Sequence, residues 1–275
     1  PTEVHPDLAV LLSTSGSTGS PKLVRISYAN LQANASSIAS YLDISKDERP
    51  ITSLPPDYSY GLSVLNSHFL KGATVLCTEA SVVQGEFWAL VKNGLATSIA
   101  GVPYTYEMLR RLRFFRMDLP SLKTLTQAGG HMKAEYVREF WDYARKNNKK
   151  FVVMYGQTEA SPRLSYACFN KNSEYFDGVG KPIKGVKIFT NVPKGQVGKI
   201  YYHSEDFMLG YYNDVINPTA RKLNSKKVAT GDIGKIIRDN ELVLMGRTDD
   251  MIKLNVRKCY LLHIQNKIQQ IDNIK

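Results

Sequence analysis

Residues 13–22 combine the chemical groups that bind a polyphosphate. The stretch is a run of Ser and Thr that contains Gly16 and Gly19 and ends at Lys22. Glycines allow tight turns that bring backbone N–H groups close to an anion. Hydroxyls donate further hydrogen bonds, and a lysine adds a positive charge. The residue types therefore predict a loop that holds phosphate groups.

The spacing of this loop differs from that of the common P-loop. In that motif four residues separate the two glycines and a Gly-Lys pair closes the loop. Here Gly16 and Gly19 are three positions apart, and Pro21 precedes the lysine. A flexible Ser/Gly linker is the alternative reading. Strand-like sequences on both sides, residues 8–12 and 22–26, favour a turn between two strands.

Two further turns follow apolar, strand-like segments. Residues 155–159 (YGQTE) offer an aromatic face in Tyr155, a hydroxyl in Thr158 and, in Glu159, the hard oxygens that Mg²⁺ prefers. Residues 127–130 (QAGG) form a glycine turn where backbone groups could meet a planar ligand. In an open parallel sheet, ligands bind beyond the carboxyl ends of the strands. Taken alone, each segment also fits an ordinary strand-turn-helix connection.

Two later segments, which we interpret as turns, between them supply aspartates and an arginine. They are residues 230–232 (TGD) and 246–249 (GRTD). An aspartate can accept hydrogen bonds from both hydroxyls of a ribose, and an arginine can donate to the aspartate. Aspartate is also common in purely structural turns.

The elements that would position these segments alternate between strand and helix in the first part of the chain. Such alternation predicts an α/β layered fold with a largely parallel sheet. From Gly178 on, short alternating segments and glycines predict antiparallel β structure, and residues 246–253 begin a separate small lobe. The expected helices are 30–41 (capped by Asn30), 61–70, 87–91, 104–115 and 133–146, and the expected strands are 51–54, 74–77, 98–102, 122–126, 151–154, 186–189, 198–202, 235–237 and 242–245.

Composition narrows the class of protein. The chain has 275 residues, 43% hydrophobic and 22% charged, which is ordinary for a globular protein. Its net charge of +11 would suit polyanions, but the Lys and Arg residues are scattered and no nucleic-acid-binding signature is present. We expect neither a specific nucleic-acid partner nor a membrane span. The three cysteines follow no metal-ligand spacing, Cys77 fits a core strand, and a reducing, cytoplasmic location is expected.

Taken together and in this order, the segments resemble the adenylate-forming superfamily, which includes acyl-CoA synthetases, luciferases and the adenylation domains of peptide synthetases. The resemblance covers nearly the whole chain and is closer to stand-alone acyl-CoA synthetases and AMP-acid ligases. The segments that carry it are the phosphate loop 13–22, an acyl-pocket element at 54–62, the adenine turn 127–132, the motif 155–159, the structural signatures 178–182 and 210–213, the ribose aspartate at 230–232 and the hinge approach 246–249.

The resemblance implies an acyl-CoA synthetase-like large domain over residues 1–248 without its N-terminal part. Residues 249–275 would be the hinge, with Asp249 as the hinge residue, and the start of a C-terminal lobe. A carboxylic acid would react with ATP and Mg²⁺ to give acyl-AMP and pyrophosphate. The thiol of CoA, or of the phosphopantetheine of an acyl carrier protein, would then displace AMP.

The same resemblance assigns roles to residues. Lys22 and the loop hydroxyls would hold the leaving phosphates, Thr158 the α-phosphate and Glu159 the magnesium ion. Asp232 and Arg247 would fix the ribose. The full expected nucleotide set is Thr14, Ser15, Gly16, Ser17, Thr18, Gly19, Lys22, Gly129, Gly130, His131, Tyr155, Gly156, Gln157, Thr158, Asp232 and Arg247. The expected acid pocket is lined by Tyr58, Tyr60, Gly61, Ser63, Val102, Tyr104 and Gly129.

The sequence departs from the family pattern near its end. The glycine expected after the hinge is Val256, and His263 and Gln265 stand where acidic residues are usual. The late lysine used for adenylation is also absent, so we expect this chain alone to bind nucleotide better than it turns over. A catalytically degenerate relative that binds nucleotide or acyl groups, and a general polyanion-binding protein, are the alternative functions. The sequence identifies neither the acid nor the acceptor thiol.

Overall fold

The computed structural model describes residues 5–14, 22–169, 176, 178–204, 208–212, 227–237, 240–248, 251–254 and 257–260. Its helices are α1 (Tyr28–Tyr41), α2 (Ser59–Phe69), α3 (Gly85–Asn93), α4 (Pro103–Arg111) and α5 (Ala134–Lys146), with short 3₁₀ helices η1 (Phe114–Arg116) and η2 (Thr158–Ala160). The described part of the chain contains no helix with the length and apolar character needed to cross a membrane.

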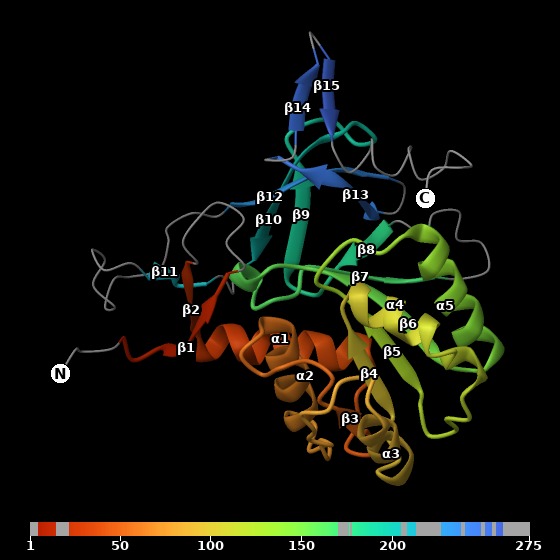
Figure 1. The fold of residues 1–275 in the computed structure, drawn as a ribbon. Helices are drawn as coiled ribbons and strands as arrows, with labels where there is room; N and C mark the ends of the chain where they lie inside the picture. Colours follow the sequence, from red (N-terminus) through yellow and green to blue (C-terminus); the bar gives the residue numbers. More distant parts are fainter. Residues whose placement is uncertain are drawn as a thin grey trace.

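The strands form three sheets, of which the largest has ten strands in the order β3-β4-β5-β6-β7-β8-β13-β12-β10-β9 (Figure 1). A three-stranded sheet has the order β1-β2-β11, and β14 pairs with β15. The strands are β1 (Leu8–Ser13), β2 (Leu23–Ser27), β3 (Pro50–Ile51), β4 (Ser98–Gly101), β5 (Thr124–Gln127), β6 (Lys150–Tyr155), β7 (Ser165–Cys168), β8 (Gly178–Pro182), β9 (Val186–Thr190), β10 (Gly198–Ser204), β11 (Gly210–Tyr212), β12 (Val228–Ile236), β13 (Leu242–Arg247), β14 (Met251–Leu254) and β15 (Arg257–Tyr260).

The α/β expectation is confirmed, and the parallel and antiparallel parts belong to one continuous sheet. Strands β3 to β6 run parallel, as the alternating strand and helix patterns predict. From β6 onward every neighbour in the large sheet is antiparallel. The antiparallel part begins at β7, earlier in the chain than residue 178.

Helices cover both faces of the parallel strands, and the alternation along each strand decides which side chain meets which layer. Ile99, Leu125 and Val153 belong to the core cluster that contains Tyr106 of α4 and Phe140 of α5. Their neighbours on the opposite face, including Ala100, Val152 and Met154, pack with Tyr60 of α2. Two-sided burial is what the near-continuous apolar character of these strands requires.

Local sequence signals explain the ends of the helices, with one correction. Asn30 does not cap α1: the cap is Ser27, whose hydroxyl accepts from the Asn30 amide nitrogen at 3.1 Å, while the Asn30 side chain accepts from the Ser27 N–H at 3.0 Å. This reciprocal arrangement starts the helix two residues earlier than expected. Pro103 begins α4, where its missing N–H costs no hydrogen bond.

Further expectations, on residues 74–77, on Cys77 and on residues 230–232, are also wrong. Residues 74–77 form no strand, because β3 offers only a two-residue partner and the pairing is a single bridge between Ile51 and Leu76. Cys77 is consequently exposed instead of lying in the core. Residues 230–232 are not a turn but lie inside β12. There the register with β10 shifts and Gly231 has a φ of +78°, the mark of a bulge.

Candidate functional site

The largest cavity, of about 780 Å³, lies beyond the carboxyl ends of β5 and β6 and extends to β12 and β13. Lys22, Glu159 and Asp232, which are far apart in the sequence, all line it. The other expected site residues in its wall are Thr14, Tyr58, Tyr60, Gly129, Gly130, His131, Tyr155, Gly156, Gln157, Thr158 and Arg247. One volume of this size can hold a nucleotide-sized ligand.

The glycine turn after β5 forms one wall of the cavity. Gly129 has a φ of +80°, and a Cβ at this position would collide with the hydroxyl of Tyr58. The Gln127 side chain stabilises the turn, because its Nε2 donates to the Gly130 carbonyl at 3.0 Å. The turn therefore requires glycine for both its conformation and its space, and it presents bare backbone to the cavity.

The segment after β6 supplies the second wall. Gly156 lies against the backbone carbonyl of Pro162, where a Cβ would collide. The Thr158 and Ser59 hydroxyl oxygens are 3.3 Å apart, and Glu159 Oε1 accepts from the Tyr211 hydroxyl at 2.7 Å. Since a carboxylate has two oxygens, this bond leaves the second oxygen of Glu159 available to a further partner.

A hydrogen-bond network around a carboxylate on β12 forms the wall of the cavity opposite the glycine turn. Asp232 and Arg247 are cross-strand partners, and Arg247 Nη1 donates to Asp232 Oδ1 at 3.1 Å. The Tyr155 hydroxyl donates to Asp232 Oδ2 at 2.5 Å. Burial, together with the negative charge of Asp232, raises the pKa of Tyr155 well above its ordinary value. Tyr155 therefore remains a hydrogen-bond donor, and the network holds the Asp232 carboxylate in a fixed orientation.

The two ends of the expected phosphate loop meet as a β-hairpin at the cavity edge. β1 and β2 pair antiparallel, and the Thr14 N–H donates to the Lys22 carbonyl at 2.9 Å. Lys22 Nζ lies 5.1 Å from the centre of the Tyr211 ring. The hairpin expectation is thus confirmed. Ser15, Gly16, Ser17, Thr18 and Gly19 lie outside the described residues, as does Asp249.

Four residues expected in the acid pocket do not line the cavity, and one of them, Ser63, lines a smaller pocket instead. Tyr104 is 67% exposed at the surface. Gly61 lies inside α2 and packs against the carbonyl oxygens of Leu54 and Pro55. Val102 stands behind the glycine turn, because its Cγ1 would be 3.1 Å from a Cβ at Gly129. Among the pocket residues that the sequence predicts, Tyr58, Tyr60 and Gly129 lie in the wall of the large cavity.

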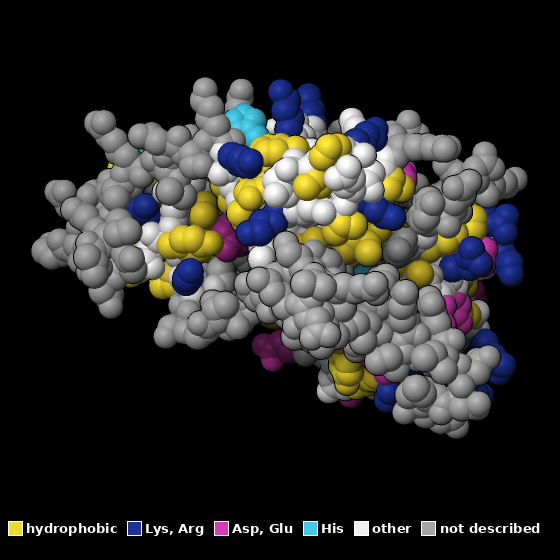
Figure 2. Space-filling model, turned by 90° about the horizontal axis from the view of Figure 1, so that it is seen from above, with side chains coloured by type: hydrophobic (Ala, Val, Ile, Leu, Met, Phe, Trp, Pro, Cys, Tyr) yellow, Lys and Arg dark blue, Asp and Glu magenta, His cyan; other side chains and the backbone are white. Residues whose placement is uncertain are grey.

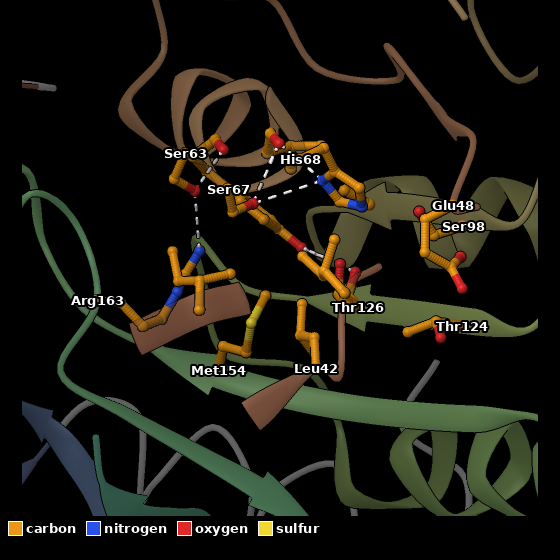
Figure 3. Close-up of a pocket in the computed structure, with 15 residues that line it drawn as sticks. Leu42, Glu48, Ser63, Ser67, His68, Ser98, Thr124, Thr126, Met154 and Arg163 are labelled. Atoms are coloured by element: carbon orange, nitrogen blue, oxygen red, sulfur yellow. Dashed lines mark hydrogen bonds between the residues drawn. The ribbon is translucent and has the colours of Figure 1, made fainter. Parts of the chain in front are cut away.

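A smaller pocket of about 30 Å³ lies behind Tyr60, between α1, α2 and the sheet. Tyr60, Met154 and Arg163 line both this pocket and the large cavity. Figure 3 shows the polar side chains that line it, which are Glu48, Ser63, Ser67, His68, Ser98, Thr124, Thr126 and Arg163. Of these, only Ser63 is among the residues that sequence reasoning places at the site.

His68 lines this pocket from α2, beside Ser67 (Figure 3). Its Nδ1 lies 2.8 Å from the Val64 carbonyl, so this nitrogen carries the proton. Burial lowers the pKa of His68, which favours the neutral ring. The sequence does not indicate His68, because a single histidine in a helix has no distinctive spacing. It does not indicate Tyr211 either, because we interpret residues 210–213 from the sequence as a structural signature and not as part of the site.

Comparisons with known proteins match these observations. The sequence model of the family described as AMP-binding enzyme matches residues 1–212. The chain is 29% identical over 218 residues to feruloyl-CoA synthase from an Amycolatopsis species, covering 75% of this chain and 43% of that protein. It is 30% identical over 211 residues to 2-succinylbenzoate–CoA ligase from Bacillus licheniformis, covering 74% and 42%. The chain thus spans less than half the length of these curated relatives.

Solved structures share the fold. O-succinylbenzoate coenzyme A synthetase from Bacillus subtilis, in complex with AMP, superimposes with a TM-score of 0.80 at 23% identity, over 94% of this chain and 53% of that one. The McyG A-PCP structure complexed with phenylalanyl-adenylate gives 0.80 at 21% identity, over 100% of this chain and 46% of that one. From the family match over most of its length and from this shared architecture, the chain belongs to the AMP-binding enzyme family.

Proposed function

We propose that this chain is the nucleotide- and acid-binding part of an AMP-forming acid–thiol ligase. The convergence of Lys22, Glu159 and Asp232 on one cavity of about 780 Å³ carries the proposal. These residues supply groups that suit MgATP: Lys22 is a cation for the phosphates, Glu159 is a carboxylate for the metal ion, and Asp232 is a carboxylate for the ribose diol. The relatives named as CoA ligases support the same reaction class.

In the first step, an oxygen of the acid's carboxylate attacks the α-phosphorus of ATP, and the bond from that phosphorus to the bridging oxygen of pyrophosphate breaks. Lys22 would neutralise the leaving phosphates and Thr158 would donate to the α-phosphate. These groups act by alignment and charge stabilisation. In the second step, a thiolate attacks the acyl carbon and AMP leaves, so the acceptor is the thiol of CoA or of a carrier protein's phosphopantetheine.

The ribose and the base have fitting partners on opposite walls. Asp232 is held by Tyr155 and Arg247 in the wall of the cavity, and its carboxylate oxygens can accept hydrogen bonds from the two ribose hydroxyls. The turn at Gly129 and Gly130 exposes backbone where side chains are excluded, which suits a planar base. His131 lies in the same wall.

The residues present also fit a magnesium ion that is held mainly by phosphate. Among the described residues there is no group of three or more His, Cys, Asp or Glu side chains that could form a metal site. Mg²⁺ commonly takes one or two protein carboxylates and completes its coordination with phosphates and water. Glu159, with one oxygen free of Tyr211, would supply that carboxylate, and the bound ion would neutralise phosphate charge.

A catalytically degenerate nucleotide-binding relative is the second candidate function, because Val256, His263 and Gln265 depart from the family pattern. Acid-dependent exchange of labelled pyrophosphate into ATP by the full-length parent protein, screened against a panel of carboxylic acids, separates the two. We expect at least one acid to stimulate exchange, and Glu159→Gln to abolish that stimulation. Nucleotide binding without exchange by any acid would favour the degenerate relative.

A general polyanion-binding function has less support. On the face seen in Figure 2, the coloured Lys and Arg side chains are scattered among hydrophobic and neutral ones and do not form one band. Binding to phosphate backbones weakens steeply with salt. We expect binding of AMP to this chain to change far less with salt than its binding to any nucleic acid, as measured by titration calorimetry from 50 to about 500 mM salt.

A further inference from the structure

Arg163 is a buried cation at the boundary between the large cavity and the small pocket. It follows η2 and precedes β7, and its residue is only 3% exposed. The Asn34 amide on α1 donates to the carbonyls of Ala160 and Arg163 at 3.3 and 3.4 Å, which fixes the backbone of this segment. Figure 3 shows the side chain reaching toward Ser63 on α2.

The contacts of the Arg163 guanidinium are weak for a buried charge. Its carbon lies 4.8 Å from the centre of the Tyr60 ring, and Nη2 donates to Ser63 Oγ at a long 3.4 Å. Its Nε has no hydrogen-bond partner among the described residues. The Tyr41 hydroxyl also interacts with the guanidinium. A guanidinium has five N–H groups in a planar fork, so these contacts leave part of its capacity to donate unused.

The neighbouring hydroxyls provide no negative charge. Burial raises the pKa of Tyr41 to about 12, and burial also raises that of Tyr60, in both cases against the opposing effect of the Arg163 charge. Both phenols are therefore neutral at physiological pH. They can orient the guanidinium, but they do not balance its charge.

No carboxylate balances it either. Within the described residues, no Asp or Glu oxygen lies within 4.0 Å of a nitrogen of Arg163. Glu48 lines the same pocket, but it is paired with Lys123 at 3.1 Å. A buried ion without a partner loses several kcal/mol of hydration free energy, so such ions are normally paired or meet a charged ligand.

The position of Arg163 indicates which kind of ligand could supply the missing negative charge. Arg163 is one of the residues that line the large cavity, together with Thr158 and Gly129, and its side chain lies at the pocket behind Tyr60 (Figure 3). The pocket has room for about two water-sized groups, which is close to the bulk of one carboxylate. An acid that enters from the reaction centre would therefore direct its far end to the guanidinium.

We propose that Arg163 binds a second carboxylate on the acid substrate, so that the preferred substrates are dicarboxylic acids activated at one end only. The inference rests on the proposed function and adds the substrate class. Arginine suits this role because its fork makes two parallel hydrogen bonds to one carboxylate. Ser63, at 3.4 Å from Nη2, is a positioning residue for the fork.

The test uses non-hydrolysable acyl-sulfamoyl adenosines, which need no turnover. Two matched pairs are titrated calorimetrically into this chain: the 4-carboxybenzoyl and 4-methylbenzoyl compounds, and the glutaryl and pentanoyl compounds. We expect at least one carboxylate-bearing compound to bind about 10- to 100-fold more tightly than its partner, which is the gain of a desolvated charge-assisted hydrogen-bond pair. In Arg163→Met, the preference should reverse in favour of the apolar partner.

Ser63→Ala keeps the charge and should reduce the preference only by about two- to fivefold. Binding of AMP reports whether each variant is folded, because AMP carries no acyl group. If Arg163→Met does not fold, the comparison of the matched pairs on the unaltered chain still decides the proposal.

Equal affinity within both pairs on the unaltered chain would overturn the proposal. So would an Arg163→Met variant that binds both members of a pair more weakly by the same factor, because the guanidinium would then contact a group common to both compounds. Failure of the chain to bind AMP and all four compounds would refute the proposed function itself, and with it this inference.

Discussion

The large cavity and the small pocket behind Tyr60 are built in different ways. The cavity is lined by turns and a strand bulge, and its carboxylates accept hydrogen bonds from tyrosines of other elements, Asp232 from Tyr155 and Glu159 from Tyr211. The small pocket is lined by side chains that also belong to the packed layers between α1, α2 and the sheet. Changes in the cavity should therefore alter binding, whereas changes in the pocket should alter stability as well.

The largest effect is expected for Asp232→Asn in the cavity. The substitution removes the charge that Arg247 balances and leaves one acceptor oxygen for Tyr155 and the ribose. We expect AMP to bind about 10- to 100-fold more weakly in calorimetry, while the free energy of unfolding changes by less than about 1 kcal/mol, because the ion pair is partly exposed. Asp142→Asn, on the surface of α5, is the control. Unchanged AMP affinity would remove Asp232 from the site.

Gly129→Ala tests a position in the cavity wall whose backbone conformation also matters for stability. We expect a loss of about 2–3 kcal/mol in the free energy of unfolding, since a φ of +80° strains alanine and the new Cβ meets the Tyr58 hydroxyl. Gly72→Ala is a matched control with a φ of +69° and open space around its Cβ, and it should lose only about 1 kcal/mol. Adding Tyr58→Phe should recover part of the difference; identical losses at the two glycines would argue against the contact.

Tyr60→Phe probes the pocket. The Tyr60 hydroxyl lies 2.9 Å from the Thr126 carbonyl and 2.8 Å from its hydroxyl, in a buried setting. Urea denaturation should show a loss of about 1 kcal/mol. Tyr104→Phe, at a 67% exposed position, should show none. A Tyr60→Phe variant as stable as the unaltered chain would contradict the expectation that changes in the pocket reduce stability.

The smallest effect is a pH dependence from His68. Because burial lowers its pKa below the ordinary 6.5, the unfolded chain binds a proton more readily than the folded chain just below that pH. The stability that His68 contributes is therefore present above pH 6.5 and lost as the pH falls through the lowered pKa. His68→Gln should flatten the slope of unfolding free energy between pH 7.5 and about 5.5. Equal slopes in His68→Gln and the unaltered chain would show that another group titrates there.

The same contrast explains what the sequence could predict. The cavity is assembled from short segments whose glycines, hydroxyls and charges are contiguous, so residues 127–130 and 155–159 could be recognised before any coordinates. The parallel strands were predictable for a related reason, since two-sided burial makes them continuous apolar runs.

The pocket could not be predicted because its members come from several elements and none has a local signature. Arg163 follows Pro162 in the sequence, and only the packing of α2 over the sheet reveals that its charge is buried. The expected strand at 74–77 failed for a non-local reason as well, because a strand needs a partner and β3 has two residues. The position of Asp232 in a bulge likewise depends on its pairing with β10 and β13.

The amide of Asn34 ties the short stretch from Ala160 to Arg163 onto α1. Thr158 and Glu159 directly precede this fixed stretch, and Arg163 ends it. The stretch therefore sets the distance between the residues that we propose to take part in activation and the residue that we propose to bind the far end of the acid. On this proposal, a longer acid would fit only if the distance between these two points increased. A shorter cation at residue 163 is the simplest change that would increase it.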